Sequence, residues 1–318
     1  MNRTSDLTRE WSLASTQMHI VSALGVSPAR VLRDIDSWLE EDAGGGDVTV
    51  WTQCPQSARM RWEIIAKQDF ILCGLFLMAA VVHRVHGASS CLVKSKFEDG
   101  SLVRKGDVVV FGEGHAAALL LAERVSLNLA ARLSGVASKT NQMRSFVESA
   151  AAHSGARPPC LLETRKTTPG LRLYEKYATR VGGARNHRHA LDTGLMLKEN
   201  HLRSFGGIEA ALASAVKHAP VLTRVEVEVS NLKEFDEALN GGADVVMLDN
   251  FALSDVRSAV ERRNASGRAV ALEVSGNLTE ENIGAVAQMG VEFVSSGALV
   301  HQATWVDMSM QLYPLELG

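Results

Sequence analysis

Strand-like runs that alternate with helical stretches in the C-terminal half place the strongest constraint on the fold of this chain. Short runs rich in β-branched residues recur there at intervals of roughly 20 to 25 residues. They read RVEVEVS, ADVVMLDN, AVALEVSG and VEFVSSGA, and the earlier runs CLLET and GLMLK extend the series. Helical spacing fills the intervals, as in NLKEFDEALNGG and LSDVRSAVERRN. This alternation predicts repeated βα units and a parallel sheet, for which a barrel is the commonest closed form.

The first half of the chain has a mixed pattern and is expected to form a separate α/β region. It contains a helical stretch, ARVLRDIDSWLEED, a glycine-rich turn, AGGGD, and the strand-like runs RWEIIAKQDFILCG and DVVVFGEG. Residues 1–28 are expected to be a loosely attached arm. From His115 onward, long helices are expected to join the two regions.

The overall charge excludes binding by bulk electrostatics. With 33 Lys and Arg against 36 Asp and Glu, the net charge is -3, which favours neither nucleic acid nor a membrane surface as partner. Cys54, Cys73, Cys91 and Cys160 are scattered, without zinc-finger spacing, and are expected to be reduced. No window holds the roughly 18 apolar residues of a membrane helix, so we expect a soluble, cytoplasmic protein.

Positive charge is concentrated locally, between Leu161 and Leu202. Arg165 and Lys166 directly follow a strand-like run, whereas His187 and Arg188 follow a glycine pair. Glycine lets the backbone approach a ligand closely, and guanidinium groups match the geometry of carboxylates and phosphates. These four residues therefore indicate a site for a small polyanion.

Other cations of this stretch have a simpler interpretation. Arg172, Lys176 and Arg180 recur at helical spacing in LRLYEKYATR. Lys176 and Arg180 are accordingly expected to lie on a solvated helix face.

Polar or small residues end the predicted strands. The two-residue period of VEVEV turns the valines to one face and Glu226 and Glu228 to the other, which we expect to be the barrel interior. Strand ends of a βα barrel meet at one mouth, and the residues expected there are Lys166, Lys198, Glu228, Asp249, Ser275 and Gly297. Helix N-capping is an alternative for Ser275 or Asp249 alone. Glu228 and Asp249, on adjacent strands, also suit Mg²⁺.

Seven motifs, in order and spacing, resemble the quinolinate phosphoribosyltransferase family. They are ETRKTTPG, GGARNHR, LKENH, VEVEV, LDN, EVSG and SSGAL. EDAGGGDVT and AERVSLNLAARLSG extend the resemblance over most of the chain from about residue 28. An ordered set of this size is far more specific than one short pattern.

The resemblance implies a two-domain α/β architecture. An N-terminal α/β sandwich over residues 29–127, completed by 303–318, would precede an incomplete, seven-stranded-type α/β barrel over 128–302. It implies a homodimer or a higher oligomer. The implied reaction converts quinolinate and 5-phosphoribosyl-1-pyrophosphate, with Mg²⁺, to nicotinate mononucleotide, pyrophosphate and carbon dioxide.

Site residues follow from the same resemblance, motif by motif. The implied binders of the quinolinate carboxylates are Arg165, His187 and Arg188. Lys166 and Lys198 would lie near the carboxylates and phosphates of the substrates, and Arg124 would be donated across the dimer interface. Glu228 and Asp249 would face the metal and the ribose. The 5′-phosphate would be bound by Ser275, Gly276 and Gly297, and the residues expected to be catalytic are Lys166, Lys198, Glu228 and Asp249.

The sequence departs from the family pattern at Ala117, Ala184, Ala190 and Glu199, none of which has an implied direct role.

Three alternative functions remain open. A related molybdenum-transport-associated paralogue shares the TRKT motif, although Lys198 favours the enzyme over it. A phosphoribosyltransferase for another aromatic acid would also suit an arginine-lined pocket. A non-catalytic barrel that binds a phosphorylated ligand would not need opposed charges at its strand ends.

Overall fold

The structure, a computed structural model, describes residues 8–53, 58–87 and 91–315, which fall into two compact units. The first unit is Met1–Ser138 with Ala303–Gly318, and the second is Lys139–Gln302. The boundary lies within α5 (Ala116–Ser154), one helix of 39 residues where the sequence predicted several. It therefore falls after residue 138 and not after the expected residue 127. Cys54 and the outermost parts of the predicted arm (1–7) and C-terminal segment (316–318) lie outside the described residues.

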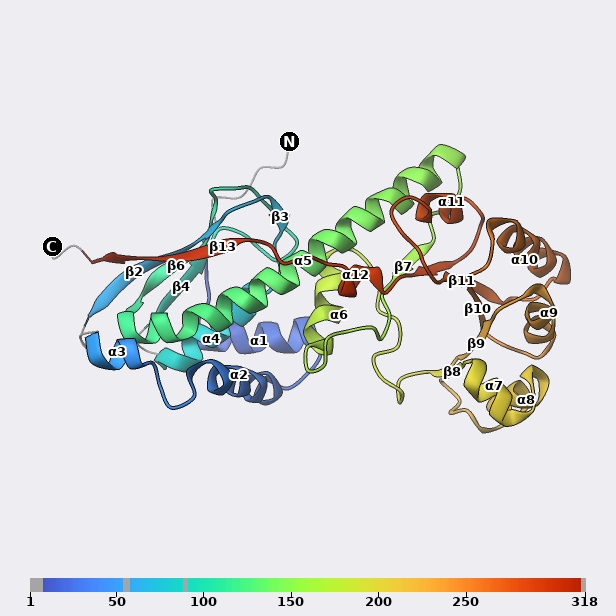
Figure 1. The fold of residues 1–318 in the computed structure, drawn as a ribbon, viewed down its shortest axis with the longest axis horizontal. Coiled ribbons are helices and arrows are strands. Elements are labelled where there is room, and N and C mark those ends of the chain that lie inside the picture. The colour runs from blue at the N-terminus through green and yellow to red at the C-terminus, as the bar shows by residue number, and fades with distance from the viewer. Residues whose placement is uncertain (1–7, 54–57, 88–90, 316–318) are drawn as a thin grey trace. The chain divides into compact units, whose positions relative to one another are not determined.

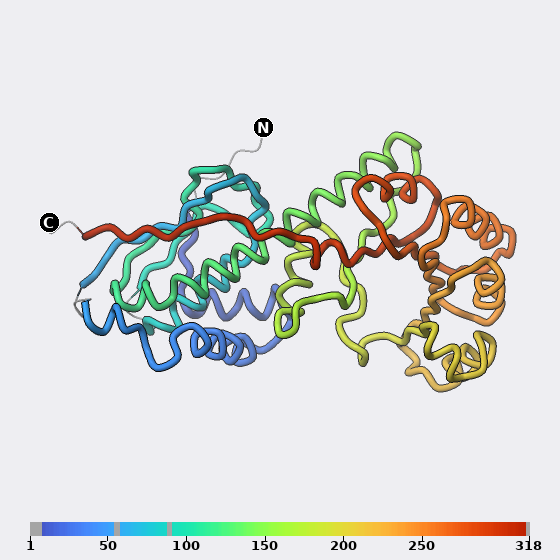
Figure 2. The backbone as a smooth tube through the Cα atoms, in the orientation of Figure 1, coloured from blue at the N-terminus to red at the C-terminus, as the bar shows by residue number. Residues whose placement is uncertain are grey.

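Among the described residues, the first unit contains a five-stranded antiparallel sheet (Figure 1). In spatial order its strands are β1 (Arg9–Glu10), β4 (Leu92–Ser95), β6 (Val108–His115), β2 (Arg59–Ala66) and β13 (Met308–Pro314). The C-terminal strand β13 pairs along its whole length with residues 60–66 of β2, and the tube of Figure 2 shows this strand in red beside blue. A separate pair consists of β3 (Phe70–Ile71) and β5 (Leu102–Val103).

Helices α1 (Leu13–Leu24), α2 (Pro28–Ala43) and α4 (Leu75–His86) pack against one another in the first unit, which also contains the short α3 (Val48–Gln53). The expectation of a loose arm is wrong for residues 9–24. Trp11, Ile20 and Leu24 are buried, and Ser12 caps α1 by accepting the Ser15 N–H at 3.1 Å. This burial of apolar side chains attaches the segment to its unit.

The second unit contains a parallel sheet whose spatial order is β7-β12-β11-β10-β9-β8. These strands are β7 (Cys160–Leu162), β12 (Phe293–Ser295), β11 (Ala271–Ser275), β10 (Val245–Asp249), β9 (Val225–Val229) and β8 (Leu195–Leu197). Every strand-like run predicted for this half forms one of them. A parallel bridge between Leu162 and Arg185 adds a seventh position beyond β7, and in the described part of the chain β7 and β8 are not paired with each other. The sheet is an incomplete α/β barrel.

Helices follow the strands of the second unit as expected for βα repeats (Figure 1). They are α6 (Arg172–Val181), α7 (Glu199–Phe205), α8 (Ile208–His218), α9 (Leu232–Asn240), α10 (Leu253–Ser266), α11 (Ile283–Ala287) and α12 (Ala298–His301). Val225, Val227 and Val229 are buried on the side of β9 that meets α8 and α9. Within the described residues, no helix has the length and apolar composition needed to cross a bilayer.

Strand register brings the polar strand ends together. Glu228 is aligned with Met247 on the next strand, and Asp249 is aligned with Ser275. Aligned residues of parallel strands share a face of the sheet. The polar groups therefore gather at one edge, the carboxyl end of the barrel.

Candidate active site

A cavity of about 530 Å³ opens at the carboxyl ends of the second unit's strands. Most of the residues predicted for the site line it. Those brought together are Arg165, Lys166, His187, Arg188, Lys198, Glu228, Asp249, Ser275 and Gly276, with Thr164, Met196, Met247, Asn250, Asn277 and Ser295 as further lining residues. Cations from the loops after β7 and before β8 thus face carboxylates at the ends of β9 and β10.

Two of the lining residues form an ion pair. Nζ of Lys198 lies 2.5 Å from Oε2 of Glu228, and Lys198 is also the N-cap residue that precedes α7. Asp249 lies on the neighbouring strand, and Asn250 donates its side-chain N–H to Oδ2 of Asp249 at 2.9 Å. Burial, followed by the charge of Glu228, raises the pKa of Asp249. Two carboxylates that repel each other in one cavity fit a hard divalent cation, which removes that repulsion.

Two guanidinium groups, those of Arg165 and Arg188, provide positive charge in the same cavity. Burial, and then the charge of Arg165, lowers the pKa of Arg188. Nε of Arg165 is buried and has no hydrogen-bond partner among the described residues, whereas Arg188 donates to the carbonyl of Gly194 at 3.0 Å. A buried donor without an acceptor is costly, and neighbouring cations repel. Both conditions favour an anionic ligand at this point.

His187 lies in the cavity wall, yet both its ring nitrogens contact protein groups. Nδ1 accepts the N–H of Arg188 at 2.7 Å, and Nε2 lies 3.2 Å from Glu226 and 3.6 Å from Glu273. The Nδ1 contact requires a lone pair there, so the ring carries its proton on Nε2. Burial lowers the pKa of His187, but the hydrogen bond to Glu226 and the charges of Glu273, Glu226 and Glu163 outweigh it and raise the pKa overall.

Glu226 and Glu273 lie behind His187 and form a group that the predicted site residues did not include. With His187 they present possible metal-ligating atoms within 4.8 Å of one another. Burial, and then the charge of Glu226, raises the pKa of Glu273 to about 7. The inward alternation of VEVEV already placed Glu226 on this face, and that was the available signal.

Two glycines make room where side chains crowd the strand ends. A Cβ added to Gly276, which has φ of 89°, would lie 2.3 Å from Oδ1 of Asn250. One added to Gly297 would lie 2.8 Å from Cδ of Lys166, although Gly297 itself does not line the cavity. Helix capping does not explain the strand-end residues, because α10 begins after Ala252 and α11 after Asn282. Asp249 and Ser275 are therefore available to a ligand.

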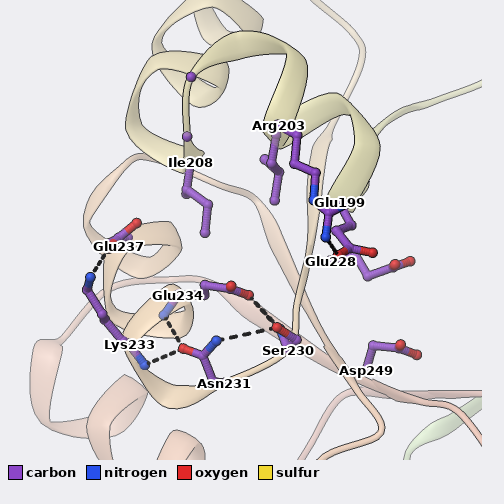
Figure 3. Close-up of a pocket in the computed structure, with 13 residues that line it drawn as sticks. Glu199, Arg203, Ile208, Glu228, Ser230, Asn231, Lys233, Glu234, Glu237 and Asp249 are labelled. Carbon is purple, nitrogen blue, oxygen red and sulfur yellow. Dashed lines mark hydrogen bonds and ion pairs between the residues drawn. The ribbon is translucent and has the colours of Figure 1, made fainter.

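A second cavity, of about 630 Å³, adjoins the first between α7, α8 and the start of α9 (Figure 3). Glu228 and Asp249 line both cavities, and Figure 3 shows them together at one side of this one. Asn231 caps α9 below, accepting the N–H groups of Lys233 and Glu234. The two carboxylates are thus accessible from both cavities.

Comparison with known families accounts for this arrangement. Residues 47–134 match the family described as quinolinate phosphoribosyl transferase, N-terminal domain, and residues 136–311 match its C-terminal domain. The chain belongs to the quinolinate phosphoribosyltransferase family.

Similar proteins cover the same span. The probable nicotinate-nucleotide pyrophosphorylase [carboxylating] of Synechocystis sp. is 37% identical over 279 residues, or 87% of this chain and 91% of that protein. The nicotinate-nucleotide pyrophosphorylase of Francisella tularensis is 36% identical, with a TM-score of 0.82 over 91% of this chain and 98% of that one. NadC from Streptococcus pyogenes is 34% identical, with a TM-score of 0.84 over 92% and 99%.

Arg124, which the resemblance to quinolinate phosphoribosyltransferases implies as a substrate-binding residue, also lies outside the cavity. Arg124 is on α5 in the first unit, with its side chain 60% exposed and 4.0 Å from Glu123. Glu199, a departure from the family pattern, is exposed at the start of α7 and pairs with Arg203. This departure leaves the Lys198–Glu228 pair in place.

The predicted solvated position of Lys176 is wrong. Its side chain is 0% exposed and forms an ion pair with Glu163, which is equally buried. Arg180, one helical turn further on, is exposed as expected. Helical spacing places both residues on one face of α6, but the depth of each depends on how the end of the helix packs.

Proposed function

We infer that this chain is a decarboxylating quinolinate phosphoribosyltransferase of NAD biosynthesis. It would convert quinolinate and 5-phosphoribosyl-1-pyrophosphate to nicotinate mononucleotide, pyrophosphate and carbon dioxide. The observation that carries the proposal is one cavity in which Arg165 and Arg188 face the Lys198–Glu228 pair and Asp249. Such opposed charges serve a reaction in which anions are bound and positive charge develops.

The acid is assigned to the arginine side of the cavity. Quinolinate carries two carboxylates, and guanidinium groups bind carboxylates through parallel N–H donors. The unpartnered Nε of Arg165 and the repulsion between Arg165 and Arg188 support this placement. His187 completes the wall, and its ring is oriented by Glu226 and Glu273.

The phosphorylated ribose is assigned to the strand ends from β8 to β12. The turn at Ser275 and Gly276, with Gly297 next to Lys166, supports 5′-phosphate binding through backbone that side chains do not obstruct. Lys166 and Lys198 would hold the departing pyrophosphate. Departure leaves oxocarbenium-like charge at the ribose C1, which Glu228 and Asp249 would stabilise while the pyridine nitrogen attacks. Positioning and electrostatics would provide most of the catalysis.

Glu228 and Asp249 are also the proposed residues for Mg²⁺. The ion would neutralise pyrophosphate charge, and it commonly binds through one or two carboxylates together with substrate phosphates. Burial, and then the charge of Glu228, raises the pKa of Asp249, and the repulsion between these two carboxylates supports such a site.

Assembly as a homodimer or a higher oligomer is proposed from the family resemblance. Exposed Arg124 would then reach the partner's cavity. The scattered cysteines and the lack of a zinc-finger spacing support a reducing, cytoplasmic location.

The deciding assay combines the purified chain with quinolinate, 5-phosphoribosyl-1-pyrophosphate and Mg²⁺, and detects nicotinate mononucleotide by chromatography. We expect product only when all three are present, and none when nicotinic acid replaces quinolinate. Product from nicotinic acid would indicate a transferase for another aromatic acid. No product from either acid would overturn the proposal.

A further inference from the structure

Two fully buried charged residues of the second unit, Glu163 and Lys176, form an ion pair next to the active site and have none of its assigned roles. Glu163 directly follows β7, and Lys176 lies in the middle of α6. Both side chains are 0% exposed, and Nζ of Lys176 donates to Oε1 of Glu163. Neither residue lines the cavity.

The pair holds the backbone of the loop that carries His187 and Arg188. Oε1 of Glu163 accepts the N–H of His187 at 3.0 Å, and Nζ of Lys176 donates to the carbonyl of His187 at 3.1 Å. Asn186 donates its side-chain N–H to Oε2 of Glu163 at 2.7 Å and to the carbonyl of Lys176 at 2.9 Å. Both backbone polar groups of His187 are therefore fixed by one buried ion pair.

Stability alone does not explain such a pair. Removing two charges from water is expensive, and well-packed apolar residues of similar size are often as stabilising as a buried ion pair. What an apolar pair cannot supply is an acceptor for the His187 N–H together with a donor for its carbonyl. The chemistry of the pair therefore matches the loop that it holds.

The position of the His187 backbone affects the cavity through two contacts. His187 lies in the wall, and its Nδ1 accepts the N–H of Arg188 at 2.7 Å. The Arg188 guanidinium is in turn held by the carbonyl of Gly194. A shift of the His187 backbone would displace Arg188 from Arg165 and disrupt the proposed carboxylate site.

We propose that Glu163 and Lys176 are positioning residues that hold the 186–188 loop so that Arg188 meets a carboxylate of the aromatic acid. This inference rests on the proposed function, because it assumes that the arginine side of the cavity binds the acid. It assigns the pair no contact with substrate.

The test uses the full chain with Glu163→Gln and Lys176→Met combined, which removes both buried charges and the donor to the His187 carbonyl. We expect a thermal unfolding midpoint near wild type, a KM for quinolinate raised at least about tenfold, and a KM for 5-phosphoribosyl-1-pyrophosphate within about twofold of wild type. Calorimetric titration with quinolinate alone should show the same loss of affinity. Unchanged quinolinate binding in the folded double variant would overturn the proposal.

Asp244→Asn is the matched control. Asp244 also accepts a backbone N–H, that of Val225 at 2.7 Å, but at the opposite end of the sheet. Both KM values should stay at wild type in this variant, and an equal rise in the KM for quinolinate would also contradict the proposal.

A milder variant covers the case in which the double variant does not fold. Asn186→Ala removes the hydrogen bonds from this side chain to Glu163 and to the carbonyl of Lys176, and should raise the KM for quinolinate by about threefold, with the other KM unchanged. A wild-type value would overturn the proposal. Wild-type protein without any activity would instead refute the proposed function, which separates the two failures.

Discussion

Nζ of Lys198 lies 2.5 Å from Oε2 of Glu228, which pairs a cation at the end of β8 with a carboxylate at the end of neighbouring β9. Their side chains are 44% and 20% exposed. Because partly exposed ion pairs contribute little to stability, either group can exchange its partner for substrate at small cost. The ion pair therefore keeps the two side chains at the cavity, and neither is packed into the hydrophobic core.

Lys198→Ala should therefore abolish turnover while leaving the fold intact. We expect a loss of at least about a hundredfold in kcat/KM, since Lys198 would bind the developing negative charge of the leaving group. Steady-state kinetics and the thermal unfolding midpoint measure the two effects. Lys217→Ala, an exposed lysine on α8, is the control and should match wild type. Near-wild-type activity without Lys198 would refute its role.

Asp249→Asn should raise the requirement for Mg²⁺. Loss of one hard, charged ligand should increase the Mg²⁺ concentration for half-maximal activity by about tenfold or more, and chelation of the metal should stop wild-type turnover. A Mg²⁺ titration of the rate measures this shift. Asp236→Asn, which removes an exposed partner of Arg262, should leave the titration unchanged. The same midpoint in Asp249→Asn and wild type would exclude Asp249 as a ligand.

Glu273 should make stability depend on pH. Burial, and then the charge of Glu226, raises the pKa of Glu273 to about 7. The charges of His187 and Lys198 lower the pKa but are outweighed. The folded state thus holds this proton more tightly than the unfolded chain, so the stabilising contribution is complete below the unfolded pKa and is lost as pH rises through about 7. Taken alone, the shift corresponds to on the order of 3 kcal/mol.

Glu273→Gln removes this titration. The free energy of unfolding of the variant, relative to wild type, should therefore increase from pH 5 to pH 8, as measured by urea denaturation. Glu281→Gln, at an exposed position, should give a difference that does not vary with pH. A constant difference for Glu273→Gln as well would show that Glu273 is already ionised across this range.

Gly276→Ala should weaken binding of the phosphorylated ribose. The new Cβ would lie 2.3 Å from Oδ1 of Asn250, so the turn or Asn250 must move. We expect the KM for 5-phosphoribosyl-1-pyrophosphate to rise about tenfold. Gly267→Ala is the matched control, because Gly267 also has positive φ but a Cβ there would contact nothing within 4 Å. Equal kinetic effects of the two substitutions would point to backbone strain alone.

Mixing two inactive variants should test the shared site. If Arg124 acts in the partner's cavity, Arg124→Ala and Lys198→Ala subunits should form hybrid dimers with one intact site each, and an equal mixture should regain about a quarter of wild-type activity. The recovery is measured as enzyme activity after the subunits have exchanged, and mass spectrometry verifies the exchange. No recovery would mean that each site is built within one chain.

Local pattern predicted much of the second unit. The two-residue alternation and the helical intervals identified its strands, and the position of a residue at the end of a strand depends only on that pattern. Because parallel strands carry their carboxyl ends to one edge, the pattern alone was enough to group Lys198, Glu228, Asp249 and Ser275. The motif resemblance added the chemical roles.

Other features depended on packing between segments far apart in the chain. Lys176 has the helical spacing of a solvated cation, yet it is buried because Glu163, at the end of β7, lies against α6. Segment 9–24 mixes Ser and Thr with isolated apolar residues, yet it packs into its unit. The sequence by itself determined the order of strands and helices and the residues at the strand ends, since these follow from local periodicity. Only the tertiary structure decided which charges are buried and which loop they hold, because burial and pairing depend on the neighbours that folding brings together.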